Sequence, residues 1–104
     1  MNDKVHSLLG FAQKAGKAVS GEEGLRWHAA NGRAFLLILA EDARPKRVRD
    51  VMMLGEQYHI KLIRFGTLES LSQAVGRPVG AAVALLDQGI AKAILDYNDG
   101  REKK

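Results

Sequence analysis

The sequence contains no cysteine, and it has only two prolines and one tryptophan in 104 residues. Without cysteine, disulfide bonds, thiolate zinc sites, iron–sulfur clusters and cysteine nucleophiles are excluded. Long hydrophobic segments are also missing: the longest apolar run, residues 34–40, is far shorter than the roughly 20 residues that cross a bilayer. The N-terminal residues lack the hydrophobic stretch of a signal peptide. We therefore expect a cytoplasmic protein with no membrane partner and no cofactor.

Hydrophobic residues make up 46% of the chain and charged residues 27%, which is typical of a folded domain. A chain of this size buries roughly 65% of its surface on folding, enough for one hydrophobic core but not for two. We expect a single domain over residues 1–97 and a polar C-terminal tail over residues 98–104. The 16 basic and 12 acidic residues give a net charge of +4, which favours a polyanionic partner.

The first third of the chain has the pattern of two helices separated by a short extended segment. Apolar residues recur every three or four positions between residues 4 and 15, and Gly16 follows as a helix stop. Residues 17–20 read as extended. Ser20-Gly21-Glu22-Glu23 has the spacing of a capping box, so we expect Ser20 to cap a second helix that ends near residues 31–32.

Residues 34–40 are apolar throughout, the pattern of a central strand that is covered on both faces. Glu41 and Asp42 follow as candidate helix caps, and Pro45 is suited to a first helical turn. These residues predict a short third helix that ends at Gly55.

The second half repeats the alternation of strand and helix. Strand patterns cover residues 60–65 and 81–86, and Thr67 is expected to cap a fourth helix between them that ends at Gly76. A final helix extends to Tyr97. The fold class is therefore α/β, a three-layer α/β/α sandwich around a small mixed four-stranded sheet.

Residues with catalytic or metal-binding spacing are not found. Gly10, Gly16 and Lys17 approach a phosphate-binding loop, but the glycines are one position too far apart, and Ala18 replaces the magnesium-binding Ser or Thr. The acidic pairs are better explained as residues that favour helix starts. The histidines occur at unrelated positions: His6, His28 and His59. We expect neither a metal site nor an enzyme.

Basic residues lie close to the turns that enter the helices. A solvated helix surface would explain them, and so would contact with phosphates. If the strands run parallel, the turns at residues 20–21, 40–42 and 66–67 gather at one edge of the sheet, where helix N-termini offer free N–H groups. We expect a concave, cationic surface at this edge, within reach of Lys14 and Lys17.

Four segments, in their order and spacing, resemble the L-seven-Ae type ribosomal protein family of kink-turn RNA binders, and most closely its small bacterial YlxQ-like branch. The resemblance covers nearly the whole chain. It implies the three-layer fold and a surface that holds the bent backbone of an RNA kink with its sheared G·A pairs. The segments are LLGFAQKAGK at residues 8–17, VSGEE at 19–23, AEDARP at 40–45 and LSQAVGRPVG at 71–80.

The resemblance also implies the contact surface: residues 21–26, the turn at Glu41-Asp42, and residues 77–79, where apolar side chains receive an extruded base. The chain departs from the family where Glu23, Gly24 and Trp27 replace the frequent Asn, Glu and Lys, and where Ser72 replaces a glycine. We expect Trp27 to lie in the core or to be half-buried, although an aromatic ring there could also stack on a base.

The leading hypothesis is a monomeric, non-catalytic protein that binds structured, kink-turn-like RNA and is associated with ribosomes or translation. The alternative is a protein-interaction module on the same fold that binds an acidic partner. In the first case basic side chains would contact phosphates, glycine would allow close backbone approach, carboxylates would accept base amino protons, and the last loop would pack an extruded base. The predicted RNA-binding residues are Lys14, Lys17, Gly21, Glu22, Glu23, Arg26, Glu41, Asp42, Arg77, Pro78 and Val79.

Overall fold

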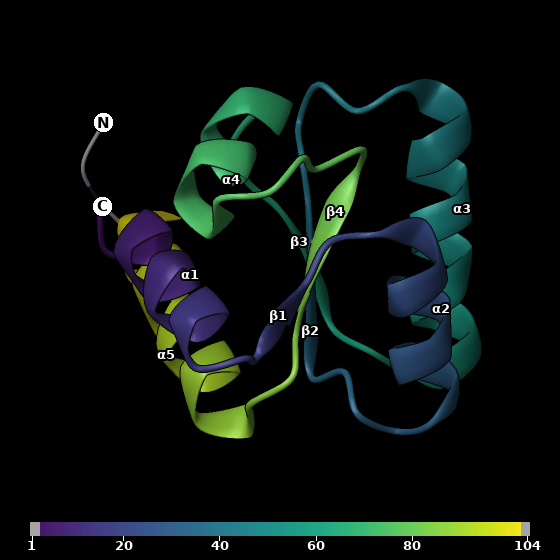
Figure 1. Ribbon diagram of the computed structural model, residues 1–104, viewed down its shortest axis with the longest axis horizontal. Coiled ribbons are helices and arrows are strands. Elements are labelled where there is room, and N and C mark those ends of the chain that lie inside the picture. The colour runs from purple at the N-terminus through teal and green to yellow at the C-terminus, as the bar shows by residue number, and fades with distance from the viewer. Residues whose placement is uncertain (1–2, 103–104) are drawn as a thin grey trace.

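The computed structural model describes the backbone of residues 3–102 and the side chains of residues 3–98. Helices and strands alternate along these residues, as the sequence predicts (Figure 1). The elements are α1 (Lys4–Lys14), β1 (Ala18–Val19), α2 (Glu22–Ala30), β2 (Leu36–Leu39), α3 (Pro45–Tyr58), β3 (Leu62–Arg64), α4 (Leu68–Val75), β4 (Ala82–Leu85) and α5 (Gln88–Glu102).

The four strands form one mixed sheet in the order β1-β4-β2-β3. Strand β2 pairs in parallel with β3 and antiparallel with β4, and β4 pairs antiparallel with β1. Consequently β1, β2 and β3 all run in the same direction, and only β4 is reversed. The predicted small mixed four-stranded sheet is confirmed.

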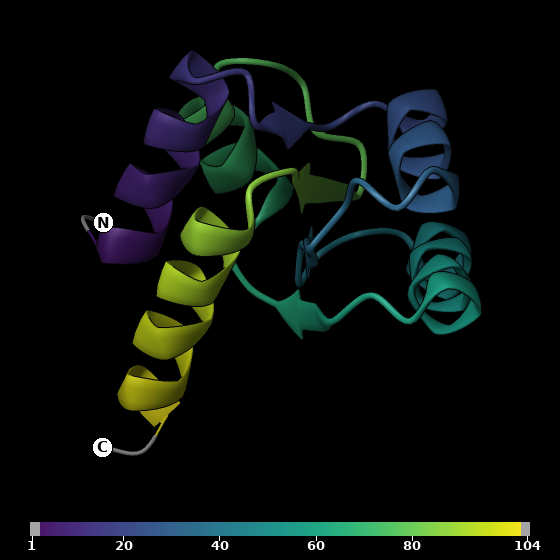
Figure 2. The ribbon, with the colours of Figure 1, turned by 90° about the horizontal axis from the view of Figure 1, so that it is seen from below.

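Each face of the sheet is covered by helices, with α1, α4 and α5 on one side and α2 and α3 on the other (Figures 1 and 2). Alternation along the central strand divides the core in two. Leu36 and Ile38 pack with the first group of helices, whereas Leu37 and Leu39 pack with the second. All four side chains are fully buried, which accounts for the uninterrupted apolar run in the sequence.

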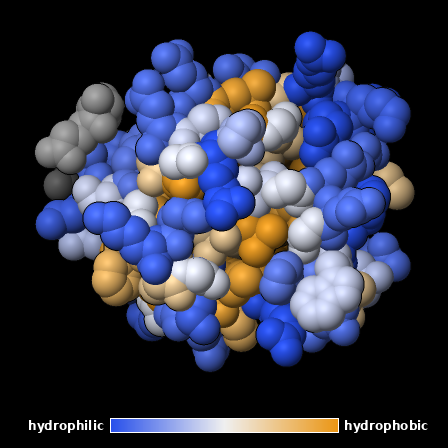
Figure 3. Space-filling model, viewed as in Figure 1, coloured by the Kyte–Doolittle hydropathy of each residue, from blue (hydrophilic) through white to orange (hydrophobic). Residues whose placement is uncertain are grey.

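The sheet is short at the edge formed by β1, because this strand has only two residues. Figure 3 looks onto this side, with β1 in front, and shows a strip of hydrophobic side chains between two hydrophilic layers. Because β1 is so short, part of the apolar interior is visible at the surface on this side.

The third helix differs from the prediction. It has 14 residues and continues through Gly55 to Tyr58, so the expectation of a short helix ending at Gly55 is wrong. A Cβ at Gly55 would lie 3.2 Å from the carbonyl oxygen of Ile60 and 3.6 Å from the Leu37 side chain. The glycine therefore lets α3 approach the sheet, and the helix ends at His59, which has a left-handed φ of 57°.

The last helix also extends beyond the prediction. The expected boundary between the domain and a polar tail at residue 98 falls inside α5, and Asn98 is only 5% exposed. Residues 103 and 104 of the predicted tail lie outside the described residues. Among the helices of the described chain, none is both long and apolar enough to cross a membrane.

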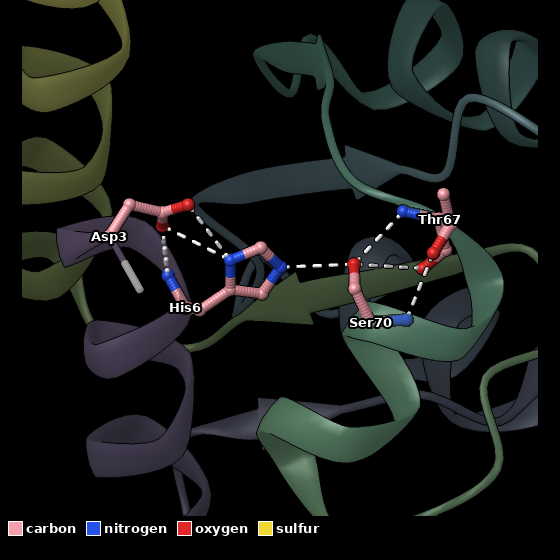
Figure 4. A network of polar contacts seen from close by, with 4 residues as sticks. All are labelled: Asp3, His6, Thr67 and Ser70. Carbon is pink, nitrogen blue, oxygen red and sulfur yellow. Dashed lines mark hydrogen bonds and ion pairs between the residues drawn. The ribbon is translucent and has the colours of Figure 1, made fainter. Parts of the chain in front are cut away.

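A polar network fastens α1 to α4 (Figure 4). Asp3 caps α1 by accepting the backbone N–H of His6 at 2.9 Å, and its carboxylate also lies 3.1 Å from the His6 Nδ1. On the other side of the ring, Nε2 lies 3.0 Å from the hydroxyl of Ser70. That hydroxyl accepts the N–H of Thr67 at 3.0 Å and completes the capping box of α4. The predicted Thr67 cap is confirmed.

Removing either end of this contact should loosen the packing of α1 on α4. We expect His6→Ala and Ser70→Ala each to lower the free energy of unfolding by about 1 kcal/mol, since each removes a partly buried hydrogen bond. The double variant should lose less free energy of unfolding than the two single variants added together, and the difference should be about 0.5 kcal/mol or more. Urea unfolding of the four proteins measures the coupling, and strict additivity would contradict a direct contact.

Candidate functional site

Four connecting segments meet at one edge of the sheet, which we call the loop edge; it points upward in Figure 1. Because β1, β2 and β3 run the same way, the segments that follow them, residues 20–21, 40–44 and 65–67, leave the sheet at the same end. The reversed strand β4 begins at this end, which brings in residues 76–81. The predicted convergence of the turns is confirmed, and the fourth loop joins them.

Segment 40–44 holds its neighbours in place by backbone hydrogen bonds on both sides. The N–H of Ala40 donates to the carbonyl of Ala81 at 2.9 Å, and the N–H of Glu41 donates to the carbonyl of Gly66 at 2.8 Å. The guanidinium of Arg64 also donates to the carbonyl of Glu41, at 3.2 Å. Three of the four segments are therefore fixed relative to one another.

Ser20 connects the remaining segment, and it does so in a way that the sequence analysis missed. The expected capping box is wrong, because the N-cap of α2 is Gly21 and the helix has no side-chain cap. The Ser20 hydroxyl instead donates to the carbonyl of Pro78, at 3.3 Å. This bond links the first loop to the last across 58 positions of sequence.

The two acidic residues after β2, Glu41 and Asp42, do not have the predicted role as helix caps for α3. Neither Glu41 nor Asp42 caps α3, which has Arg44 at its N-cap and Pro45 in its first turn. Asp42 instead accepts the backbone N–H of Leu68 at 2.8 Å, at the start of α4. One carboxylate oxygen thus positions a neighbouring helix.

The other predicted acidic residues differ in how much they are engaged. Glu22 lies 3.0 Å from Arg26 on its own helix and 4.0 Å from Arg47 on α3. The exposed carboxylates of Glu23 and Glu41 have no hydrogen-bond or ion-pair partner among the described residues. They are therefore available to an external donor, whereas Glu22 orients two arginines.

The loop edge is not cationic overall, contrary to the expectation. Basic and acidic residues occur in equal numbers in this region, which comprises the connecting segments, Arg64 and the first turns of α2, α3 and α4. The basic residues are Arg44, Lys46, Arg47, Arg64 and Arg77, and the acidic ones are Glu22, Glu23, Glu41, Asp42 and Glu69.

Lys14 and Lys17 do not lie at the loop edge. Lys14 is the last residue of α1, and Lys17 precedes β1, at the end of the strand away from Ser20. The carbonyl of Lys17 accepts the N–H of Leu86, just past the far end of β4, at 2.8 Å. The expectation that both lysines reach the loop edge is therefore corrected: they belong to the opposite edge, which we call the basal edge.

In the last loop, Arg77 and Pro78 are exposed, but Val79 is not. Val79 is only 6% exposed and packs in the core beside Val75. Its N–H donates to the hydroxyl of Ser72 at 2.9 Å. The apolar surface that the sequence analysis placed on Val79 is therefore turned inward, and the serine at a frequent glycine position anchors the loop.

Trp27 is 54% exposed, so of the two positions expected for it, in the core or half-buried, the first is wrong. Its ring contacts that of His28 edge-on, with centroids 4.9 Å apart, and the guanidinium of Arg33 lies 5.5 Å from its centroid. An exposed indole beside a guanidinium is an arrangement that can stack on a base.

Gly24, which departs from the usual family pattern, is explained by packing. A Cβ at this position would lie only 2.5 Å from the Cγ1 of Val19. Since that distance is far inside van der Waals contact, the glycine allows α2 to approach β1. A larger residue at position 24 requires Val19 to move or to become smaller.

The contacts of Asp3, His6 and Ser70 involve the residue types of a hydrolytic triad. However, the Ser70 hydroxyl contacts Thr67 N, Thr67 O and His6 Nε2, all within the protein. These bonds cap a helix and join it to α1, so the network has a structural explanation.

An α/β/α sandwich with a mixed sheet and loops converging at one edge defines a class of small binding domains. Within this class, the chain belongs to the Ribosomal protein L7Ae/L30e/S12e/Gadd45 family, whose pattern it matches over residues 3–95. The family resemblance predicted from the sequence is confirmed. The family and the curated relatives are described as ribosomal and RNA-binding proteins, which confirms the prediction that the protein is not an enzyme.

Two curated relatives are called RNA-binding protein YlxQ. The chain is 32% identical to the one from Bacillus subtilis over 92 residues, which are 88% of this chain and 92% of the relative. It is 26% identical to the one from Enterococcus faecium over 97 residues, 93% of each chain.

Two solved structures share the fold. A Bacillus halodurans protein of unknown function has a TM-score of 0.87 at 26% identity, covering 94% of this chain and 99% of its own. The 15.5 kD RNA-binding protein of Giardia lamblia has a TM-score of 0.74 at 17% identity, covering 95% and 92%. The predicted fold class is thus confirmed.

Gly24 and Val19 supply a direct test of the packing between α2 and β1. We expect Gly24→Ala to lower the free energy of unfolding by about 1 kcal/mol, because overpacking outweighs the gain in helix propensity. In a Val19→Ala background the same change should raise it by up to about 1 kcal/mol. Thermal and urea unfolding would show the reversal of sign, and a Gly24→Ala change that destabilises both backgrounds equally would contradict this contact.

Proposed function

We propose that the protein binds RNA and recognises a kink-turn-like structure at the loop edge. The observation that carries the proposal is the convergence of residues 20–21, 40–44 and 76–81, the segments in which the family resemblance places the RNA contacts. The relatives described as RNA-binding proteins support it. Because hydrogen bonds join these loops, the surface is preformed, which reduces the entropic cost of binding.

The chemistry of the loop edge suits a bent RNA backbone better than a long straight duplex. The N-termini of α2 and α3 have no side-chain cap, so their free N–H groups and positive dipole ends can meet phosphates, whereas Asp42 and Thr67 already accept N–H groups at the start of α4. Gly21 is exposed with no side chain, so the backbone of the RNA can approach closely. The free carboxylates of Glu23 and Glu41 can accept amino protons of bases, as expected for readout of exposed base edges.

Because acidic and basic residues are equal in number at this edge, the shape of the RNA should matter more for binding than its overall negative charge. A surface with little net charge gains less from counterion release than a basic one, so that affinity depends on how well a particular fold of RNA meets the N–H groups and arginines. We accordingly propose a structured RNA, of ribosomal or other origin, as the partner in the cytoplasm, bound by a monomer.

The experiment compares a kink-turn RNA with a straight duplex of equal length, using the full chain and fluorescence anisotropy at several salt concentrations. We expect the kink-turn RNA to bind at least about tenfold more tightly, a difference of about 1.4 kcal/mol. Equal, weak binding to both RNAs would contradict kink recognition. Binding of an acidic protein with no RNA binding would favour the alternative of a protein-interaction module.

A matched pair of variants locates the surface. Arg77→Ala removes an exposed cation from the last loop, and Lys92→Ala removes one from α5, in the helical layer on the other side of the core from α2. We expect Arg77→Ala to weaken binding and to reduce the slope of log affinity against log salt by about 1, and Lys92→Ala to change neither. If Arg77→Ala changes neither the RNA affinity nor its salt dependence, the last loop is not part of the interface.

A further inference from the structure

A second concave surface lies at the basal edge, away from the loop edge. It is an open pocket of about 310 Å³ where the turns after α1 and α2 meet the ends of β2 and β4. We call it the basal pocket. Its volume is at the lower limit of small-ligand sites. It is lined by Gly16, Lys17, His28, Gly32, Arg33, Phe35 and Leu86.

The basal edge has a net positive charge, whereas the loop edge has none. The connecting segments and the neighbouring helical turns contain four basic residues and two acidic ones. One of the two acids, Asp87, accepts the N–H of Ile90 at 2.8 Å. The pocket lining itself contains Lys17 and Arg33 and no carboxylate. The basic residues are Lys14, Lys17, Arg33 and Lys61, and the acidic residues are Glu56 and Asp87.

Positive charge near helix C-termini is ordinary, because it complements the helix dipole. The aromatic residues at this edge are not explained in that way. Phe35 is 40% exposed, although the four residues that follow it in β2 are completely buried. The guanidinium of Arg33 lies 5.5 Å from the centroid of the exposed Trp27 ring. Basic side chains interleaved with exposed aromatic rings are typical of surfaces that stack bases and hold phosphates.

His28 adds a polar group to the wall of the pocket. Its Nδ1 is out of reach of solvent and has no hydrogen-bond partner among the described residues. A buried ring nitrogen without a partner costs free energy, and an atom that water does not reach is not a contact point for a ligand in the pocket.

The basal pocket is close to the loop edge along the β1 side. Lys17 and Ser20 are separated by only three positions in extended chain, about 10 Å. Figure 3 looks onto this side, where hydrophobic side chains are visible between the two layers. A strand of RNA that leaves the loop edge can therefore follow this side to the basal pocket without crossing a helical layer.

We propose that the basal pocket binds a single-stranded RNA segment that continues from the structured RNA held at the loop edge. One base stacks on Phe35, and Lys17 and Arg33 contact the phosphates on either side of it. This inference rests on the proposed function for its biological partner, but it assigns a separate site that can be measured alone.

The first experiment uses a hexa-adenylate oligonucleotide and the fluorescence of Trp27, the only tryptophan in the chain. Binding should change the fluorescence, because Arg33 lies over the indole ring. The double variant Lys17→Ala, Arg33→Ala should lose the interaction, and its own unbound spectrum serves as reference. Phe35→Leu, which keeps an apolar side chain without a stacking surface, should weaken binding about tenfold. Lys92→Ala is the control and should bind normally.

The second experiment compares a kink-turn RNA with the same RNA carrying a six-nucleotide single-stranded extension. We expect the extension to increase the affinity about tenfold. Lys17→Ala, Arg33→Ala should remove this gain, reduce the salt slope for the extended RNA by about 1.4, and leave the affinity for the unextended RNA within about twofold.

The outcomes separate the two proposals. Tight binding of the unextended kink-turn RNA with no gain from the extension overturns the basal pocket alone. Oligonucleotide binding that the basal variants abolish, without kink-turn recognition, overturns the proposed function and keeps the basal pocket. If a polyglutamate peptide displaces the oligonucleotide at equal concentration, or if the oligonucleotide binds the double variant equally well, then base stacking in this pocket is refuted.

Discussion

Two backbone hydrogen bonds in the middle of the loop edge determine how the surface is built. The bonds from Ala40 to Ala81 and from Glu41 to Gly66 fix the loop of the central strand to the loops on both sides. Asp42 and Arg64 reinforce this arrangement with side-chain bonds to backbone groups. Since backbone groups carry most of these contacts, the geometry tolerates changes of side chain at the surface. The edge can thus keep its shape while its recognition residues vary.

The distribution of charge divides the molecule into two surfaces with different properties. At the loop edge, basic and acidic residues occur in equal numbers, and Glu22 forms ion pairs with Arg26 and Arg47. At the basal edge, basic residues outnumber acidic ones and lie beside exposed aromatic rings. A net charge of +4 for the whole chain therefore describes neither surface. For the proposed RNA ligand, the first surface would supply geometric selection and the second a less specific, salt-dependent contribution.

Much of the architecture could be predicted from the sequence, because it depends on local pattern. The uninterrupted apolar run at residues 34–40 identified the central strand, and Thr67 was recognised as a helix cap. Gly55 was misinterpreted because a glycine that ends a helix and one that allows close packing look alike in sequence. Their difference depends on the backbone of Ile60, which only the fold brings near.

The candidate site was predicted less completely than the fold, since its bonds join residues that are distant in sequence. Ser20 has the spacing of a cap, but its hydroxyl meets Pro78 from the other end of the chain. Lys17 lies at the basal edge because it precedes β1 whereas Ser20 follows it, so the strand separates the two residues. Arg64 could have been found, because it ends a strand at the edge that was already under consideration.

The two outer strands of the sheet are short, with two residues in β1 and three in β3. Such strands offer few unpaired backbone groups as a template for another chain, and Lys61 and Arg64 place charges at both ends of β3. Joining of sheets from two molecules is therefore disfavoured on both sides. The edges of the sheet are thus protected against aggregation, although its two central strands, β2 and β4, are completely buried and apolar.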